Sequence, residues 1–570
     1  MDTPAPVEPT PTADHLTPAS PISRRQVIAG TAVAGAAAAS GVAAVALSGA
    51  ADAATPLFRH GVASGDPLPD AVVLWTRVTP TPEATPGSGR GPAVDVTWEV
   101  AADEGFRTVV SSGTTRTSRR RDHTVKVDAG GLRPSTWYWY RFRVGGTTSP
   151  VGRTRTAPSY DDSPDHLRFG VVSCANLQAG YFHAYRALAR RDDLHAVVHL
   201  GDYLYEYGPG EYGYGKDDVD VRRHVPAHEM VSLRDYRRRH AQYKRDADLA
   251  ALHLRLPFIA TWDDHEFADN AWKGGAENHD PETEGSWRAR RRAAFRAYDE
   301  WMPVRLSGTA EVRDGRKIYR RLRFGRLLEL SMLDLRSYRT EEIDSASMTG
   351  GEQEIAGAAQ MRWLTTGLRD SSARWKLVGN PVMIAPVSFG QLPQRSADAI
   401  AEMVGDAVGS EGLPYNLDQW DGYVRDRRDL YRYLHDNDIS DVVFLTGDIH
   451  SAWACDLPLD AGAYPFADRR TVGVEMVCTS ITSNNFKDML GTTALTPFAA
   501  TALRAANPHI RFVDLDNHGY SVLDVTSGRA QMDWYVTADR KGSDDSSTWV
   551  RSYQTTAGSR RLQQVYRPVS

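Results

Sequence analysis

Cysteine is scarce in this chain of 570 residues, which contains only Cys174, Cys455 and Cys478. An odd and low number of cysteines argues against a framework of disulfide bonds. A large excess of charge of either sign is also absent, because 67 Lys and Arg stand against 72 Asp and Glu, for a formal net charge of −5. This balance lacks the basic excess of nucleic-acid-binding proteins, so we expect no nucleic-acid binding and only local charged sites.

The chain also lacks a long leucine-rich hydrophobic run. Its most apolar stretch is built of Ala, Gly and Val, follows Arg24 and Arg25, and ends in the A-x-A pattern Ala51-Asp52-Ala53. This pattern resembles a twin-arginine signal peptide, with a retained membrane anchor as the alternative. We therefore predict a disordered tail and signal over residues 1–54, the twin-arginine translocation machinery as a partner, and a secreted or cell-envelope protein.

Residues 55–157 read as a small β-sandwich. Short runs of β-branched and aromatic residues alternate there with turn residues. The segment "LRPSTWYWYRFRV" (132–144) resembles strand F of a fibronectin-like sandwich, in which one tyrosine forms the corner contact. Its alternating aromatics favour a sandwich core over a platform for carbohydrate or lipid. The polar, proline-containing segment 155–166 then predicts a linker.

From residue 158 to 570, apolar strand-like runs alternate with helical stretches, which predicts an α/β layered domain. Two basic stretches, 232–256 and 286–302, have the pattern of amphipathic helices with solvated charges. Two further segments, 206–245 and 385–425, are long enough to serve as lids over a site.

Side chains that bind metals follow five of the apolar runs in this domain. They are Cys174 and Asn176, Asp202 and Tyr205, the run Asp263, Asp264, His265 and Glu266, then Asn380, and finally Asp448 and His450. Ligands bind beyond the ends of strands in sheets of this kind, so we expect these groups to converge. Taken alone, each has an ordinary structural reading; Cys174, for example, would pass for a buried core thiol.

The chemistry of these groups points to two different cations. A thiolate, a phenolate and a histidine around a bridging carboxylate favour Fe³⁺, whereas carboxylate and amide oxygens favour Ca²⁺ or Mn²⁺. Two adjacent metal ions can stabilise both the attacking and the leaving oxygen of a phosphoryl transfer. In this reading, Asp202 is the bridge and Tyr205 the phenolate.

The motifs also carry a family resemblance. G-D-x-x-Y, [ND]-H-E and G-[HD]-x-H occur in this order, as in the metallophosphoesterase superfamily. The stretches "GVASGDPLPDAVVLWTRV" (61–78), "SCAN", "GDYLYEYG", "WDDHE", "LDLRSYR", "GNPVM" and "LTGDIH" resemble the PhoD-like alkaline phosphatases, a family that includes secreted phospholipase D enzymes. The resemblance runs from about residue 56 to about 535. It implies an α/β metallophosphoesterase catalytic domain, an αββα sandwich, preceded by a small fibronectin-like β-sandwich.

The resemblance also implies roles for individual residues. Cys174, Tyr205 and His450 match the Fe³⁺ ligands, and Asp202 matches the bridging carboxylate. One or two Ca²⁺ would be bound by Asp264, Asp448, Asn380 and, as an additional candidate, Asn270. His265 matches the histidine that contacts the phosphate or protonates the leaving oxygen. Arg336 and Asn176 are candidate phosphate contacts.

We therefore expect an exported, monomeric phosphatase that cleaves small phosphate monoesters by attack of a metal-bound hydroxide. The same ligands serve diester hydrolysis, so a phospholipase D or phosphodiesterase acting on phospholipids or wall polymers is the alternative. A surface protein that binds ligands through its sandwich without catalysis is a third reading, which the complete set of ligand-type residues disfavours.

Overall fold

The computed structural model describes residues 56–306, 317–342, 353–404, 410 and 412–569. The predicted tail and signal, residues 1–54, lie outside this range. All three cysteines lie within it, where they are buried and form no disulfide bond. Within the described residues, no helix combines the length and hydropathy needed to cross a bilayer.

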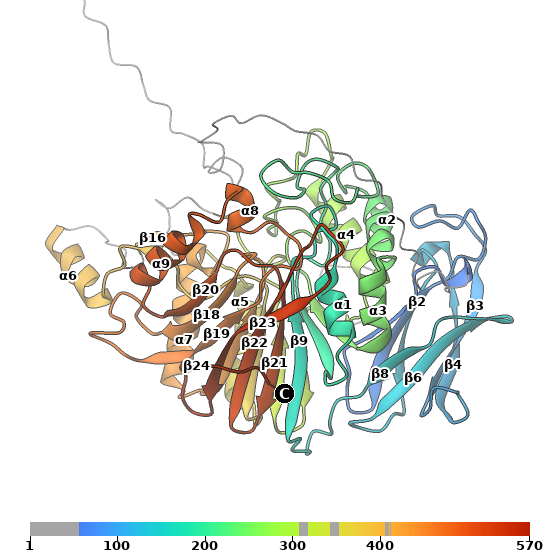
Figure 1. Cartoon of the computed structure of the whole chain (residues 1–570), viewed down its shortest axis with the longest axis horizontal. Helices are drawn as coiled ribbons and strands as arrows, with labels where there is room; N and C mark the ends of the chain where they lie inside the picture. Colours follow the sequence, from blue (N-terminus) through green and yellow to red (C-terminus); the bar gives the residue numbers. More distant parts are fainter. Residues whose placement is uncertain (1–55, 307–316, 343–352, 405–409, 411, 570) are drawn as a thin grey trace, which may run out of the picture. The chain divides into compact units, whose positions relative to one another are not determined.

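The larger sheet has ten strands in the order β24-β23-β22-β21-β9-β10-β11-β1-β2-β5 (Figure 1). Its strands are β1 (Val62–Gly65), β2 (Ala71–Arg77), β5 (Thr124–Gly130), β9 (His166–Val172), β10 (Ala196–Leu200), β11 (Phe258–Thr261), β21 (Gly519–Thr526), β22 (Arg529–Thr537), β23 (Ser547–Thr556) and β24 (Leu562–Val565). Strands β9, β10 and β11 run parallel to one another, so their carboxyl ends lie at one edge of the sheet.

The second sheet has seven strands in the order β12-β13-β14-β17-β19-β18-β20. They are β12 (Arg320–Phe324), β13 (Leu328–Met332), β14 (Trp375–Asn380), β17 (Val442–Thr446), β18 (Ala452–Pro458), β19 (Thr471–Val477) and β20 (Ile510–Asp514). Strands β13, β14, β17 and β19 are parallel. A short ribbon of β15 (Ser388–Phe389) and β16 (Leu413–Pro414) stands apart from both sheets.

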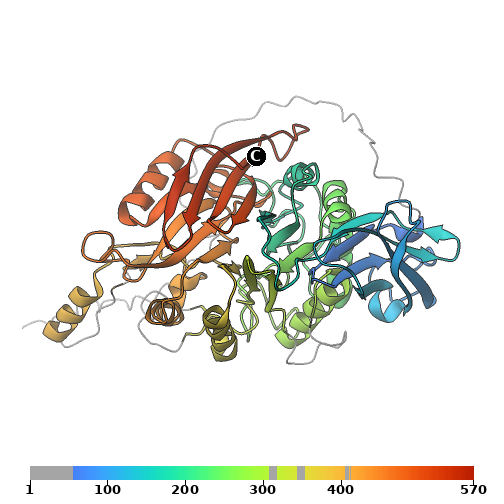
Figure 2. The same ribbon diagram turned by 90° about the horizontal axis from the view of Figure 1, so that it is seen from below.

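Helices cover the outer faces of the two sheets (Figure 2). On the ten-stranded sheet they are α1 (His183–Ala189), α2 (Leu233–Lys244), α3 (Ala247–Arg255) and α4 (Trp287–Trp301). The other helices are α5 (Gly357–Asp370), α6 (Gln394–Val404), α7 (Val424–Asp436), α8 (Phe486–Leu490) and α9 (Thr496–Ala506). Of these, α5 and α7 contribute to the core on the seven-stranded sheet.

Successive side chains of the central strands point alternately into two hydrophobic cores, one between the two sheets and one beneath the helices. In β17, Val443 and Leu445 pack between the two sheets, whereas Val442 and Phe444 pack in the core that includes α5 and α7. Successive side chains of a strand point to opposite faces, so a strand buried on both faces reads as a continuous apolar run. The result is a layered α/β arrangement with two mixed sheets packed face to face.

The basic stretch 232–256 forms two helices rather than one. Ser232 and Asp235 form a capping box that begins α2. Asp246 then caps α3, because its carboxylate accepts hydrogen bonds from the backbone N–H groups of Asp248 and Leu249. An aspartate in this role satisfies the first backbone N–H groups of a new helix and thereby interrupts the preceding one.

The N-terminal region is a β-sandwich whose second sheet contains β3 (Val94–Ala101), β4 (Val109–Thr117), β6 (Trp137–Val144), β7 (Thr147–Thr148) and β8 (Gly152–Arg155). Its core lies between this sheet and strands β1, β2 and β5. Tyr138 forms the predicted corner contact, since its hydroxyl oxygen accepts a hydrogen bond at 2.8 Å from the backbone N–H of Arg133.

This sandwich shares a sheet with β9, β10 and β11 of the following region. β1 runs parallel to β11 with Gly65 opposite Phe258, and a Cβ on Gly65 would lie 2.1 Å from the carbonyl oxygen of Pro303. Asp66 follows, and its carboxylate accepts hydrogen bonds from the side chain of Arg320 and the backbone of Arg305. The "SGD" of the 61–78 motif therefore joins the two regions. The domain boundary at residue 157 stays a prediction.

Lys244, the last residue of α2, is buried among aromatic and histidine side chains. Its Nζ lies 2.9 Å from Nε2 of His253 and 5.0 Å from the ring centroids of Trp75 and Tyr203. Burial holds the pKa of Lys244 well below its usual value. The unfolded chain therefore binds a proton that the folded chain does not, and stability rises with pH towards the unfolded pKa of about 10.4.

We expect Lys244→Met to raise the melting temperature at pH 7 and to flatten the rise in stability between pH 7 and 10. Burial of the ammonium group opposes folding at neutral pH, and an uncharged side chain of similar length removes that cost. The matched control is Lys126→Met, because Lys126 donates to Asp299 at 2.6 Å and its loss is expected to destabilise the protein. Thermal melts at several pH values test both; a lower melting temperature for Lys244→Met at pH 7 would contradict the prediction.

Candidate metal centre

The predicted ligands meet where strands of the two sheets end. Cys174 follows β9, Asp202 follows β10, Asp264 follows β11, and Asp448 and His450 follow β17. Potential ligand atoms lie within 4.8 Å of one another in three overlapping groups: Cys174, Asp202 and His450; Asp202, Asp264 and His265; and Asp202, Asp263, Asp264 and Asp448. Asp202 belongs to all three groups, which is the position expected of a bridging carboxylate.

The backbone at four of these positions is in the left-handed region. The φ angles are 60° at Cys174, 54° at Asp202, 62° at Asp448 and 55° at His450. Residues other than glycine rarely adopt this conformation, and such strain is concentrated at functional sites. The turns after β9, β10 and β17 thus hold the ligand side chains in positions that ordinary strand-to-loop geometry would not give.

Tyr205 completes the group that contains Cys174. Its hydroxyl lies 2.9 Å from Oδ2 of Asp202 and 3.2 Å from Nε2 of His450. Nδ1 of His450 donates to the backbone carbonyl of Asn484 at 2.8 Å, which leaves the lone pair on Nε2, the nitrogen that faces Tyr205. Four side chains of the predicted Fe³⁺ site therefore lie together.

The opposite side of Asp202 is built of carboxylates. Asp263, Asp264 and Asp448 surround it, and Gln419 donates to Asp448 at 2.9 Å. Asp264 accepts a hydrogen bond from the backbone of Asn270 at 2.7 Å. This arrangement of oxygen ligands is the type that Ca²⁺ prefers.

The electrostatics of the site favour bound cations. Burial, with Asp264 and Asp263 among the contributing neighbours, raises the pKa of Asp202 well above its usual value despite the opposing effect of His265. Burial and then Asp202 likewise raise the pKa values of the Cys174 thiol and the Tyr205 phenol. Positive charge placed between these groups would favour their ionised forms.

Two buried oxygens in this region lack hydrogen-bond partners among the described residues. They are Oδ1 of Asp202 and Oδ1 of Asn270. A buried polar atom without a partner is costly, so each oxygen is suited to a bound cation. Asn270 also has a left-handed φ of 51°, and its amide nitrogen donates to Glu277 at 2.7 Å. The residues present therefore fit a pair of metal ions.

His265 lies beside the cluster and is held by Glu206. Its Nδ1 donates to Oε2 of Glu206 at 2.8 Å, and its ring stacks on that of Tyr205 with centroids 4.1 Å apart. Although burial acts to lower the pKa of His265, the carboxylates of Asp264, Glu206 and Asp202 raise it well above its usual value. The ring is thus suited to carry a proton beside the cluster.

Three predicted site residues have their side chains engaged elsewhere. The amide of Asn176 donates to the carbonyl of Tyr212 at 2.7 Å, and its oxygen accepts from the backbone of Gln178. The amide of Asn380 donates to Val382, and its oxygen accepts from Trp420. Their roles as phosphate contact and Ca²⁺ ligand stay predictions.

Arg336, the third, is a buried ion-pair partner of the cluster. Its guanidinium donates two hydrogen bonds of 2.8 Å to Asp418, contacts Asp263, and lies 3.6 Å from Asp264. These contacts direct the charge of Arg336 toward the carboxylates. A direct contact between Arg336 and phosphate stays a prediction. Its position nevertheless helps Asp263 and Asp264 to remain ionised.

Sequence reasoning assigned no individual role to three residues of this site, although Asp263 is among the polar side chains that follow its strand. Asp263 belongs to a ligand group, Glu206 holds His265, and Gln419 contacts Asp448. Asp263 and Glu206 follow strands β11 and β10 within a few residues of predicted ligands, which is a usable signal. Gln419 comes from a distant loop and has no such signal.

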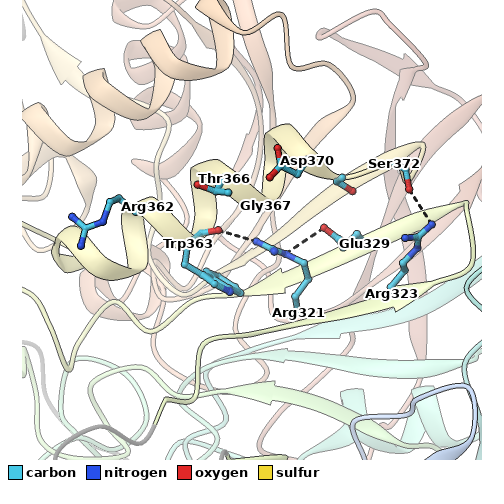
Figure 3. Close-up of a pocket in the computed structure, with 10 residues that line it drawn as sticks. Arg321, Arg323, Glu329, Arg362, Trp363, Thr366, Gly367, Asp370 and Ser372 are labelled. Carbon is cyan, nitrogen blue, oxygen red and sulfur yellow. Dashed lines mark hydrogen bonds and ion pairs between the residues drawn. The ribbon is translucent and has the colours of Figure 1, made fainter.

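A separate surface pocket of about 400 Å³ lies between α5 and the hairpin of β12 and β13 (Figure 3). None of its lining residues belongs to the ligand groups. Arg321 pairs with Glu329 at 3.3 Å and stacks on Trp363, and Arg323 donates to Ser372. Since these two arginines already have partners, the pocket does not compete with the cluster as the candidate centre.

Comparison with known proteins decides the family. The model of the PhoD-like phosphatase family matches residues 169–534, and that of the PhoD-like phosphatase N-terminal domain matches residues 42–158. The chain belongs to the PhoD-like phosphatase family. It is 37% identical over 490 residues to alkaline phosphatase D of Bacillus subtilis (strain 168), covering 84% of this chain and 77% of the relative. A solved structure of PhoD matches with a TM-score of 0.78 and 34% identity, over 90% of this chain and 92% of that one.

Membership assigns the enzyme class. This PhoD-like phosphatase is a phosphoric ester hydrolase of alkaline phosphatase D type, and its substrate is a phosphate ester. The described sandwich corresponds to the region matched by the N-terminal family model. The ligand cluster lies within the region matched by the phosphatase model.

Proposed function

We propose that this chain is an exported, metal-dependent phosphatase that hydrolyses phosphate monoesters in a metallophosphoesterase domain of αββα type. The observation that carries the proposal is the two-sided cluster around Asp202. Cys174, Tyr205 and His450 lie on one side, and the carboxylates of Asp263, Asp264 and Asp448 on the other. Two unlike donor sets that share one carboxylate are suited to two unlike cations.

The donor chemistry supports Fe³⁺ on the first side and Ca²⁺ on the second. Cys174, Tyr205 and His450 would hold the iron, Asp202 would bridge, and Asp264 and Asp448 would hold calcium, with Asn270 and Asn380 as further oxygen donors. When bound, such ions supply Lewis acidity that activates water and neutralises charge on the phosphoryl group.

The surrounding protein groups prepare the site for an anionic substrate. Glu206 orients His265 and favours its protonated form, so that the other ring nitrogen can donate to a phosphate or leaving-group oxygen. Arg336 supports the carboxylates from behind. The aromatic rings of Tyr205, Tyr207 and Tyr212 all lie within 6.3 Å of the His265 ring, centroid to centroid.

Export through the twin-arginine pathway is part of the proposal. It is supported by Arg24, Arg25 and the A-x-A pattern at residues 51–53, which lie outside the described residues. That pathway carries folded proteins, which suits an enzyme that takes up its metal ions before it leaves the cytoplasm. The proposed location is therefore the cell envelope or the medium.

The ratio of kcat/KM for a phosphate monoester to that for the matched diester tests the proposed substrate class. The assay uses exported, metal-replete protein and an aryl monoester and diester with the same leaving group. A strong preference for the monoester is expected. A strong preference for the diester would contradict the proposal and favour the phospholipase D or wall-polymer reading.

A further inference from the structure

A second layer of protein groups supports the Cys174 side of the cluster. The segment Thr482–Asn484, between β19 and α8, lies directly against it. The carbonyl oxygen of Cys174 accepts hydrogen bonds of 3.3 Å from the backbone N–H groups of Thr482 and Ser483. The carbonyl of Asn484 accepts from Nδ1 of His450 at 2.8 Å. One short segment therefore contacts two of the proposed Fe³⁺ ligands through its backbone.

Ser483 adds a side-chain contact to the third of these ligands. Its Oγ lies 2.6 Å from the hydroxyl oxygen of Tyr205 and 2.9 Å from the carbonyl oxygen of Cys174. Ser483 is fully buried. Its single proton has two acceptors, and a phenolate is the stronger because hydrogen bonds to a charged oxygen are shorter and about twice as strong.

The segment is held so that Ser483 cannot easily move away. Arg540 donates to the carbonyl of Thr482 and, at 2.9 Å, to Oδ1 of Asn484. Asp488 in turn pairs with Arg540 at 2.7 Å. The amide of Asn484 donates to the carbonyl of Gly213 at 2.8 Å. These contacts fix the Ser483 hydroxyl opposite Tyr205 independently of any bound ion.

We propose that Ser483 is a positioning residue whose hydroxyl donates a hydrogen bond to the Tyr205 phenolate and thereby sets how strongly Tyr205 binds its metal ion. This inference rests on the proposed function, in which Tyr205 is an Fe³⁺ ligand. A hydrogen bond to the phenolate oxygen withdraws electron density from it, which weakens its donation to iron. Because Ser483 is buried, water does not compete for the hydrogen bond of its hydroxyl.

The absorption spectrum of the iron-loaded protein tests the inference. Phenolate bound to Fe³⁺ has a charge-transfer band in the visible range, whose energy falls when the phenolate becomes a better donor. Ser483→Ala is expected to move this band to longer wavelength and to lower the Fe³⁺/Fe²⁺ potential. Iron affinity is expected to rise by about 10-fold, because the phenolate donates more strongly without the hydrogen bond; the size is typical of groups that contact metal ligands.

Two variants serve as controls for the spectrum. Ser483→Thr keeps the hydroxyl and should keep the wild-type band. Thr482→Val removes a neighbouring hydroxyl that donates to the carbonyl of Asn176 at 2.6 Å, and should also leave the band in place. Ser483→Gly replaces Ser483→Ala in the comparison if the alanine variant does not fold.

The outcomes separate this inference from the proposed function. A band present in the wild type and unmoved in Ser483→Ala would overturn the role of Ser483 alone. Iron-loaded wild-type protein without any phenolate band would overturn the assignment of Tyr205 as an iron ligand, and the inference with it. A band that moves in Ser483→Ala and stays in both controls is the predicted result.

Discussion

Replacing Asp202 by Asn is expected to remove bound metal and phosphatase activity together. Asp202 is common to all three ligand groups, and its Oδ1 has no hydrogen-bond partner among the described residues. An amide in its place cannot bridge two cations as a carboxylate does. We expect kcat/KM for a phosphate monoester to fall by at least about 1000-fold, the scale on which removal of one essential electrostatic element acts. Metal analysis and steady-state kinetics on the same preparation measure both effects.

The stability of the metal-free Asp202→Asn protein shows whether the loss is chemical rather than structural. Asp202 is buried beside Asp263, Asp264 and Asp448, so neutralising it without metal is expected to leave the melting temperature unchanged or higher. The matched control is Asp524→Asn on β21, which removes a buried carboxylate paired with Arg168 at 3.0 Å. That variant is expected to have a lower melting temperature but the wild-type metal content and kcat. Full activity with full metal in Asp202→Asn would refute the bridging role.

Replacing His265 by Asn is expected to lower kcat by about 100- to 1000-fold, within the usual range for loss of a general acid. The loss should depend on the leaving group, since a p-nitrophenolate leaves without a proton whereas an alkoxide needs one. We therefore expect a much larger loss for an alkyl phosphate than for p-nitrophenyl phosphate. Parallel kcat measurements on the two substrates check this prediction.

Metal content decides between two roles for His265. One of its ring nitrogens lies within 4.8 Å of carboxylate oxygens of Asp202 and Asp264, as a metal ligand would. Its Nδ1, however, is hydrogen-bonded to Glu206. If it acts on the substrate, His265→Asn retains the wild-type metal content; loss of a metal ion from this variant would instead make it a ligand. His183→Asn is the matched control, because His183 is buried outside the cluster and bonded to the carbonyl of Asp539.

Much of the cluster could be predicted because its residues directly follow apolar strands. A buried parallel strand reads as a short apolar run, and the first polar residues after it lie at the edge of the sheet where ligands gather. Cys174, Asp202, Asp264, Asp448 and His450 all stand in that position. Their convergence therefore follows from the strand pattern together with the family motifs.

What could not be predicted depends on contacts between distant segments. Asp418 and Gln419 reach Arg336 and Asp448 from a loop whose sequence has no periodic pattern. The pairing of β1 with β11 could not be predicted either, because no local sequence pattern specifies the register of two strands almost 200 positions apart. The break between α2 and α3 was not predicted for a more local reason. The amphipathic pattern continues through residues 232–256 and conceals the helix start that the Asp246 cap creates.

The metal content of the active, exported enzyme is the most informative single measurement on this protein. We expect iron and calcium together in the purified protein, with activity lost when a calcium-selective chelator is added and recovered when Ca²⁺ is returned. We also expect Cys174→Ala to bind less iron but similar calcium, since Cys174 belongs only to the group with Asp202 and His450. Full activity in a protein that contains no iron, or that is indifferent to removal of calcium, would contradict the account.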